Sequence, residues 1–440
     1  MWNRWLFKRV DNSALIFFRI AFGLLIALEA IGGIFTGWVR RTLVEPDFTF
    51  NFIGFEFLQP LPGDLMYYYY AVMGIFGILV MIGFKYRFSM FCYTLMWAAV
   101  YLMQKSSYNN HYYLLMLLCF IMIFLPAHKA LSYDAWKNKA VRAIAMPRWV
   151  WLFIVIQLWI VYSYASIAKL YPDWLDGTVP ELLMRGKRNY WLVGEFLQQP
   201  WIKWVIAYFG LIFDLLIVPM LLWRRTRVPF FILAIFFHLF NSFVFHIGIF
   251  PYLSLAFCVF FFPTQKVNKY LLRNKKPYYD GEEVVVPDHD RILKFAIIVW
   301  FIIQVSLPLR HWVIKDNVLW TEEGHRLSWR MMLRTKSGRS TFKVVEKGTT
   351  DTITVQKNKY LSNKQRRIIS TKPDVIWQFA QRLKQEYARE GKDIQVFVEA
   401  KVSVNGRPYE RLIDPQVDIA NEQWNYFAHH DWILPSNLEE

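Results

Sequence analysis

Three groups of polar residues lie at the ends of apolar segments, and their side chains are suited to acid–base chemistry. The lysine among them has an apolar, aromatic setting, in which an amine can be neutral at pH 7 and act as a general base. A lysine at the end of a membrane span also commonly reaches the interface and only anchors its helix, and the spacing leaves both interpretations open. The groups are Asn109-Asn110-His111, Lys169, and His246 with Gly248 and Phe250.

Ionisable and amide side chains also lie inside the apolar segments, where burial is costly and a partner or a ligand is expected. Three of these residues carry a full charge, and we expect them to pair between helices and to serve packing. The others lie close together in a single segment. Their pattern is compatible both with hydrogen bonds between helices and with a binding site. The charged residues are Arg19, Glu29 and Asp214, and the others are His238, Asn241 and Ser242.

Several common chemistries are not indicated by the sequence. Cys92, Cys119 and Cys258 all lie in apolar segments, so neither a disulfide framework nor a thiolate metal site is expected. No HExxH or CxxC pattern accompanies the nine histidines, and there is no Walker loop, GxGxxG or GxSxG motif. The net charge of +17 does not indicate nucleic acid, because most of the excess lies in short loops between apolar segments.

The elements that must position these residues are membrane helices. Of the 440 residues, 55% are hydrophobic and only 19% are charged, and the charges are concentrated between apolar segments. Since a span needs about 20 mostly apolar residues, we predict a polytopic α-helical membrane protein with about eight or nine transmembrane helices. The predicted spans centre on 14–35, 66–83, 88–104, 112–126, 149–168, 202–222, 228–246, 250–263 and 293–308.

Basic residues in alternate loops predict the orientation of the chain. Lysine and arginine are enriched in cytoplasmic loops, whereas the remaining loops here are mixed in charge. The polar groups described above then meet near one membrane depth on the non-cytoplasmic side. The C-terminal region of this multi-pass integral membrane protein would therefore lie outside the cytoplasm. The basic loops are 4–9, 85–87, 129–148, 224–227 and 266–276.

A soluble α+β domain is predicted for residues 309–440, after a transmembrane domain over residues 1–308. Residues 340–345 and 352–356 alternate like the two strands of a hairpin. Residues 373–390 form an amphipathic helical pattern that ends before Gly391. A further alternating segment ends at Asn405-Gly406, which is a strong hairpin signal.

Six motifs occur in order along the chain, and together they resemble one known family. They are Asn109-Asn110-His111; Ala168-Lys169-Leu170 with Asp173-Trp174; Phe237-His238 with Asn241-Ser242, Phe245, Gly248 and Phe250; Trp320-Thr321 followed by Ser328-Trp329 and Met331-Met332; residues 402–405 with 411–418; and Trp432 with Pro435. In these motifs the chain resembles the vitamin K-dependent γ-glutamyl carboxylases and their bacterial relatives, the horizontally transferred transmembrane domain proteins. The resemblance covers nearly the whole chain.

The resemblance implies an enzyme that couples oxygenation of a reduced naphthoquinone, to its 2,3-epoxide, with carboxylation of peptidyl glutamate by CO2. The implied reactants are vitamin K hydroquinone or menaquinol, O2 and CO2, without a metal, and the implied partners are the membrane and a glutamate-containing peptide. Lys169 and His111 are the implied catalytic residues. The implied quinol-binding residues are Asn109, Asn110, His238, Asn241, Ser242 and Phe245, and the implied peptide-binding residues are His325, Arg326, Trp329, Arg330 and Arg334.

Two other functions were compared with this expectation. A quinol epoxidase or quinone-binding membrane protein without carboxylation would keep the same membrane residues. A transporter is disfavoured, because the sequence has no inverted repeat and no paired broken helices. The chain also departs from the animal carboxylases, since it has Ala168 where they have a second lysine, and 322–327 differs from their glutamate-site sequence.

Overall fold

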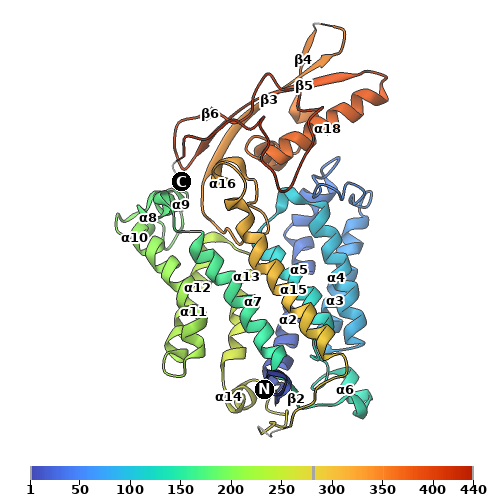
Figure 1. Cartoon of the computed structure of the whole chain (residues 1–440), viewed down its shortest axis with the longest axis vertical. Helices are drawn as coiled ribbons and strands as arrows, with labels where there is room; N and C mark the ends of the chain where they lie inside the picture. The colour runs from blue at the N-terminus through green and yellow to red at the C-terminus, as the bar shows by residue number, and fades with distance from the viewer. Residues whose placement is uncertain (1, 280–282, 350, 439–440) are drawn as a thin grey trace.

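The computed structural model describes residues 2–279, 283–349 and 351–438. Long helices lie side by side in one bundle, and the C-terminal sheet region lies at the end of the bundle opposite the N-terminus (Figure 1).

Six helices in the described part of the chain are long and apolar enough to cross a membrane, so the chain is described below as a membrane protein. Three shorter or less apolar helices complete the bundle, so the expected count of eight or nine spans stays a prediction. The six are α2 (Ser13–Phe35), α3 (Leu65–Ile82), α7 (Arg148–Ile167), the continuous Ile202–Leu222, α12 (Arg227–Phe245) and Asp290–Trp312. The others are α4 (Tyr86–Met103), α5 (Asn110–Phe124) and α13 (Phe250–Phe257).

Local sequence explains why α5 and α13 are short. The side chain of Asn109 accepts a hydrogen bond from the Tyr112 amide and thereby caps the start of α5. Pro126 disfavours a helical conformation at the residue before it, and α5 accordingly ends at Phe124. Between α12 and α13 the chain turns through left-handed residues at His246 and Gly248.

Two long helical segments are composite. Ile202–Leu222 consists of α10 (Ile202–Trp204), a π-helical turn (Val205–Phe209) and α11 (Gly210–Leu222), and Asp290–Trp312 consists of α15 (Asp290–Leu309) and a 3₁₀ turn (Arg310–Trp312). Short elements occupy the two ends of the bundle. They are α1 (Trp2–Phe7), β1 (Arg9–Asp11), α6 (Tyr133–Lys137), β2 (Ala145–Pro147), α8 (Pro172–Leu175), α9 (Thr178–Arg185), α14 (Thr264–Tyr270) and α16 (Val318–Thr321), and β1 pairs with β2.

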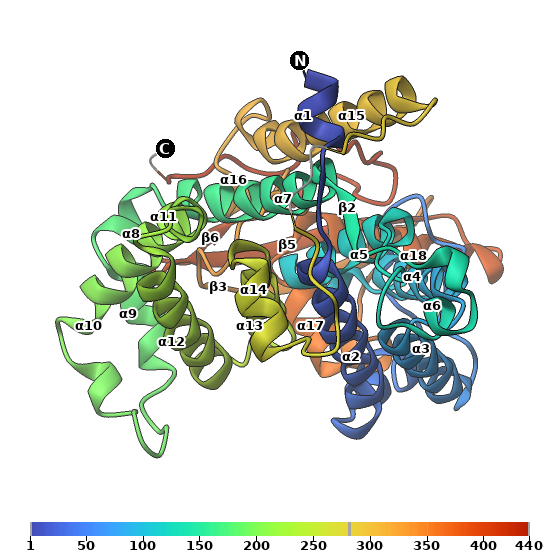
Figure 2. The ribbon, with the colours of Figure 1, turned by 90° about the horizontal axis from the view of Figure 1, so that it is seen from below.

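The bundle has two groups of helices with a junction between them. Seen along the bundle, α2 to α6 form one group and α8 to α12 form the other (Figure 2). Helix α7 packs on α11, and α13 packs on both α12 and α2, so these two helices connect the groups. The largest hydrophobic core runs through this junction.

The C-terminal region is a four-stranded antiparallel sheet in the order β4-β3-β5-β6, with helices packed on it. The predicted hairpin is confirmed, since Val344 of β3 pairs with Ile353 of β4. The hairpin at Asn405-Gly406 is also confirmed, because both residues are left-handed and β5 then pairs with β6. The elements are β3 (Lys336–Glu346), β4 (Thr352–Thr354), α17 (Asn363–Ile369), α18 (Pro373–Arg389), β5 (Ile394–Val404) and β6 (Glu410–Arg411).

Side chains of this region fix it to the bundle through a loop of the membrane domain. Gln365 donates a hydrogen bond to the Phe48 carbonyl (2.8 Å), and Gln378 donates to the Asn51 carbonyl (3.0 Å). The buried ammonium of Lys105, in the turn before α5, lies 2.6 Å from Asp374 of α18. The sheet region is therefore held directly over the ends of α4 and α5.

Candidate functional site

Lys169 lies just beyond α7, where Pro172 starts the short helix α8. Its side chain does not extend to the surface, since only 7% of the residue is exposed. The ammonium nitrogen donates to Asp214 Oδ2 of α11 at 2.5 Å and to the Ala165 carbonyl at 3.1 Å. It also lies 5.6 Å from the centre of the Trp174 ring. The snorkelling interpretation of Lys169 therefore does not describe this structure.

Lys169 and Asp214 line a cavity of about 330 Å³ within the bundle, which we call the membrane cavity. Most of its wall is aromatic or aliphatic. Some of the wall residues reach the surface of the bundle, since Phe196, Trp201 and Phe236 are each at least half exposed. A cavity with this lining suits a flat apolar ring that comes from the bilayer. The polar residues in its wall are His111, Tyr162, Lys169, Asp214 and Asn241.

Two histidines lie beside the membrane cavity. His111 of α5 lines the cavity and stacks on Phe250, with ring centres 4.5 Å apart. His238 of α12 is buried behind the wall, and its Nε2 is 3.0 Å from the hydroxyl of Tyr162. The predicted residues Asn241 and Phe245 also line the cavity.

Four of the six predicted quinol-binding residues do not line this cavity, and His238, behind its wall, is one of them. Asn109 caps α5, as described above. Asn110 donates to the Arg330 carbonyl at 2.8 Å and accepts from the Tyr108 hydroxyl. Ser242 is on the outer side of α12, with its hydroxyl 3.0 Å from that of Tyr252. The structure thus brings Lys169, His111, Asn241 and Phe245 together, and gives Asn109 and Asn110 structural contacts.

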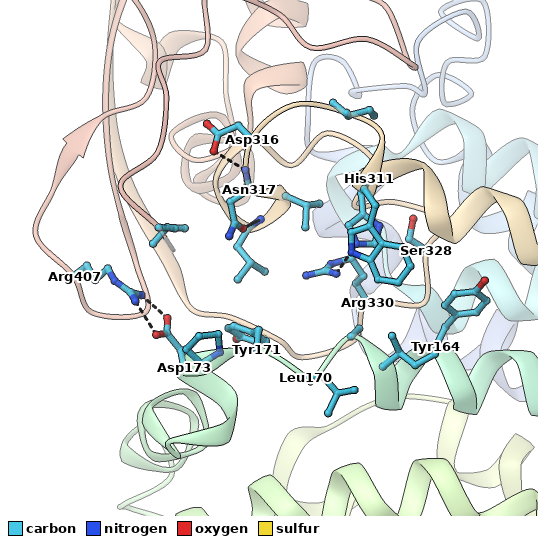
Figure 3. A pocket seen from close by; sticks show the side chains of 18 residues that line it. Tyr164, Leu170, Tyr171, Asp173, His311, Asp316, Asn317, Ser328, Arg330 and Arg407 are labelled. Atoms are coloured by element: carbon cyan, nitrogen blue, oxygen red, sulfur yellow. Dashed lines mark hydrogen bonds and ion pairs between the residues drawn. The ribbon is translucent and has the colours of Figure 1, made fainter. Parts of the chain in front are cut away.

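A second pocket lies next to the membrane cavity, between the bundle and the C-terminal region, and we call it the outer pocket. Its volume is about 290 Å³. Arg330, His311 and Ser328 lie on one side of it, and the ion pair between Asp173 and Arg407 lies on the other (Figure 3). Its wall is therefore far more polar than that of the membrane cavity.

The two cavities share a wall made of two short segments, residues 168–170 and 328–332. In the first segment Lys169 lines the membrane cavity, while its neighbours Ala168 and Leu170 line the outer pocket. In the second, Met331 and Met332 line the membrane cavity, while Arg330 lines the outer pocket. Neighbouring residues of the same chain segment therefore reach both compartments.

Arg330 differs from the other two predicted arginines in its partners. Arg326 is paired with Asp374, and Arg334 is paired with Glu322. Among the described residues Arg330 has no carboxylate partner, and its buried Nε has no hydrogen-bond partner at all. Burial lowers the pKa of the Arg330 guanidinium to about 10, so that it remains charged at neutral pH.

His311 holds one end of this guanidinium. Its Nδ1 is 2.7 Å from the Pro308 carbonyl, which only accepts, so Nδ1 carries the proton. Its Nε2 then accepts from Arg330 Nη1 at 3.1 Å. The remaining edge of the guanidinium carries Nη2 and the buried Nε, which has no hydrogen-bond partner among the described residues.

The two other predicted peptide-binding residues are buried in the same loop. His325 contacts Arg334 Nη1, with nitrogen distances of 3.2 and 3.4 Å. Trp329 is 1% exposed and lies against Tyr113, with ring centres 4.8 Å apart. Both side chains contact other protein groups. Neither lines the outer pocket.

Two residues of the site were not selected from the sequence. Asp214 was expected to pair between helices and to serve packing; it does pair, and its partner is Lys169 in the cavity wall. Its only signal was an acidic residue in an otherwise apolar segment. His311 had no signal, because a histidine at the end of a span has many ordinary roles. Within the described residues, no group of three histidine, cysteine or acidic side chains is placed to hold a metal ion.

Comparison with known families gives two matches along the chain. The HTTM domain matches residues 7–265, and the vitamin K-dependent gamma-carboxylase lumenal domain matches residues 289–439. No solved structure matches the chain. The fold and the first match define a polytopic membrane protein of the HTTM class. With both domains present in one chain, the protein belongs to the vitamin K-dependent γ-glutamyl carboxylase family. Membership implies a carboxylase-like enzyme that uses vitamin K hydroquinone, O2 and CO2, and the lumenal match indicates an extracytoplasmic C-terminal region.

Proposed function

We propose that the protein carboxylates peptidyl glutamate at its γ-carbon and couples this step to oxygenation of a reduced naphthoquinone to the epoxide. The observation that carries the proposal is the shared wall between the two cavities. Lys169 lines the membrane cavity, and the residues on either side of it in the chain line the outer pocket. Arg330 lines the outer pocket, and the next residue, Met331, lines the membrane cavity. Two half-reactions that must exchange a proton over a short distance need such an arrangement.

On the membrane side, the residues present fit a reduced naphthoquinone. When bound, the hydroquinone supplies with O2 the strong base that removes a γ-proton, which no protein side chain can do. Lys169 would accept the proton of the quinol hydroxyl at Nζ. His111 and Asn241 would orient the ring by hydrogen bonds, and the aromatic walls would exclude water. Menaquinol is the expected quinol in a bacterial inner membrane.

On the outer side, Arg330 would hold the carboxylate of the substrate glutamate through Nε and Nη2. His311 would keep the guanidinium in this orientation by accepting from Nη1. The peptide would approach from the aqueous side, where the C-terminal domain over residues 309–440 covers the bundle. Arg326, Arg334, His325 and Trp329 would shape the loop, and Asn109 and Asn110 would fix the wall from below.

The proposal is tested by incubating the purified protein in lipid nanodiscs with reduced vitamin K, ¹⁴C-bicarbonate and a glutamate peptide. We expect label in the peptide and a matching amount of epoxide, both dependent on O2. Epoxide without label at any peptide concentration would support a quinol epoxidase instead. A control without hydroquinone should give no label in the peptide. Label in that control would come from a contaminating carboxylase and not from the coupled reaction.

A further inference from the structure

Asp214 is the single carboxylate in the wall of the membrane cavity among the described residues. It comes from α11, 45 residues away from Lys169 in sequence, and its side chain is 8% exposed. Lys169 Nζ donates to Asp214 Oδ2, and both side chains are buried, so the two groups form a charge-assisted hydrogen bond inside the bundle. An amine bonded to a carboxylate in this way does not act as an isolated base.

The other charged residues inside spans provide a contrast. Arg19 donates to the carbonyls of Ala127 and Ala130 and serves to hold a loop. Glu29 accepts from the hydroxyl of Tyr112 at 2.7 Å. Neither Arg19 nor Glu29 lines the membrane cavity, and neither contacts a residue with a proposed chemical role. Packing accounts for these two residues, whereas Asp214 both pairs with Lys169 and lines the cavity.

We propose that Asp214 acts through Lys169 as the second half of one proton-accepting pair. This inference rests on the proposed function and deepens it, because it names the group that makes Lys169 able to accept a proton. Lys169 donates a hydrogen bond to the Asp214 carboxylate, and a lysine in its ammonium form cannot accept a further proton. The carboxylate removes this obstacle without releasing a proton to water.

The proton transfers balance in two steps within the pair. Lys169 first passes one ammonium proton to Asp214, so that an N–H bond breaks and an O–H bond forms at Oδ2. The neutral amine then accepts the proton of the quinol hydroxyl, and the electron pair of that O–H bond stays on the substrate oxygen. The pair gains one proton and one positive charge, which the negative charge left on the substrate balances.

Other titratable groups surround the pair and must be considered in its pH dependence. His111 comes from α5, Tyr162 from α7 and His238 from α12, and the last two bind each other. Asp173 lies beyond the shared wall and is paired with Arg407. Asp214 is thus the one acidic group in direct contact with Lys169 in the described part of the chain.

The test compares Asp214→Asn with the wild type in steady-state quinol epoxidation from pH 6 to pH 9. Asparagine keeps the shape and can still accept from Lys169, but it cannot take a proton. We expect a loss of about 100-fold or more at pH 7. The pH profile of the variant should also differ from that of the wild type, because a proton on Lys169 can then leave only to water and not to a carboxylate. Glu29→Gln, which removes a buried carboxylate elsewhere in the bundle, should keep the wild-type profile.

A second pair of variants covers the case in which Asp214→Asn does not fold. Added ethylamine should restore turnover to Lys169→Ala, in which Asp214 is retained, and restore at least tenfold less in Lys169→Ala/Asp214→Asn. Equal rescue of the two, or a pH profile of Asp214→Asn like that of the wild type with a rate within threefold, would overturn the inference. Absence of epoxide from the wild type would instead contradict the proposed function itself.

Discussion

Lys169 is an uncommon case of a lysine at the end of a membrane helix that points inward. Lysines at such positions usually extend to the interface, because their charge is then hydrated. Here the ammonium group is buried against Asp214 and faces an aromatic ring and the membrane cavity. Under the proposed function, this position allows the group to exchange a proton with a ligand in the cavity.

The first prediction concerns Lys169→Arg. Arginine can keep the ion pair with Asp214, but its guanidinium stays protonated at working pH and cannot accept a proton. We therefore expect a folded protein that binds quinone and has lost about 100-fold or more of its epoxidation rate. Lys169→Ala should be equally inactive. Near-normal turnover by the arginine variant would mean that Lys169 only holds the helices together.

The second prediction concerns Arg330→Gln. If Arg330 binds the substrate carboxylate, the change should weaken peptide binding by about 2–5 kcal/mol, as for a desolvated charge pair. Epoxidation without peptide should change far less, since Arg330 does not line the membrane cavity. Peptide KM and peptide-free epoxidation are the two measurements.

Arg326→Gln is the matched control for this prediction, because it removes an arginine of the same loop that is already paired with Asp374. Its expected effect is on unfolding, with a loss of about 3–5 kcal/mol for a broken buried pair. A selective rise in peptide KM for Arg326→Gln, and none for Arg330→Gln, would reverse the assignment of the two residues.

At the scale of elements, the loop that forms the outer half of the shared wall has an unusual backbone. Leu327, Trp329 and Met332 all have positive φ angles, between 53° and 61°, without being glycine. Such residues cost about 1–2 kcal/mol each and persist only where the surroundings fix them. Here the Tyr108 hydroxyl accepts from the Leu327 amide, and Asn110 binds the Arg330 carbonyl. The start of α5 therefore fixes the loop that holds Arg330.

The third prediction is the pH dependence of stability from the buried charges under this loop. Burial lowers the pKa of Lys336 to about 7 and those of Lys105 and Lys372 to about 8. An unfolded lysine keeps its ordinary pKa near 10.5, so the unfolded chain binds more protons above pH 7. Stability should therefore rise as pH increases from 7 to 9, as measured by the Tm of the detergent-solubilised protein.

At acidic pH, stability is also expected to increase with pH. Arg326 and Lys105 hold the pKa of Asp374 well below its usual range, against the cost of burial. This contribution is fully present above the ordinary pKa near 4 and is lost as the pH falls below it. A Tm that decreases steadily from pH 7 to pH 9 would contradict the account of the three lysines. A Tm that rises as the pH falls below 4 would contradict the account of Asp374.

Local patterns were enough to predict many of these elements but not their contacts. The β3–β4 hairpin, the helix α18 and the turn at Asn405-Gly406 follow from alternation, amphipathic spacing and turn chemistry, which act over a few residues. The pairing of Lys169 with Asp214 and of Arg330 with His311 depends on how separate helices pack. No local pattern contains that information, and the motif resemblance named only one member of each pair.

At the scale of the whole molecule, the fourth prediction concerns orientation. The C-terminal region lies at the end of the bundle opposite the N-terminus, and five basic loops alternate with mixed ones. A reporter fused after Glu440 should be active only in the periplasm or an equivalent compartment. Activity of a cytoplasmic reporter at this position would place the outer pocket in the cytoplasm and reverse the proposed peptide access.

The central claim is that one molecule joins quinol oxidation in the membrane cavity to C–H cleavage in the outer pocket. The most direct test is the loss of γ-deuterium from a deuterated glutamate peptide to solvent, measured by mass spectrometry alongside epoxide. At a peptide concentration near the wild-type KM, we predict loss that requires both hydroquinone and O2, falls about 100-fold or more in Lys169→Arg, and falls in Arg330→Gln while epoxide still forms. Epoxide formation by the wild type at saturating peptide without any loss of deuterium would contradict the claim.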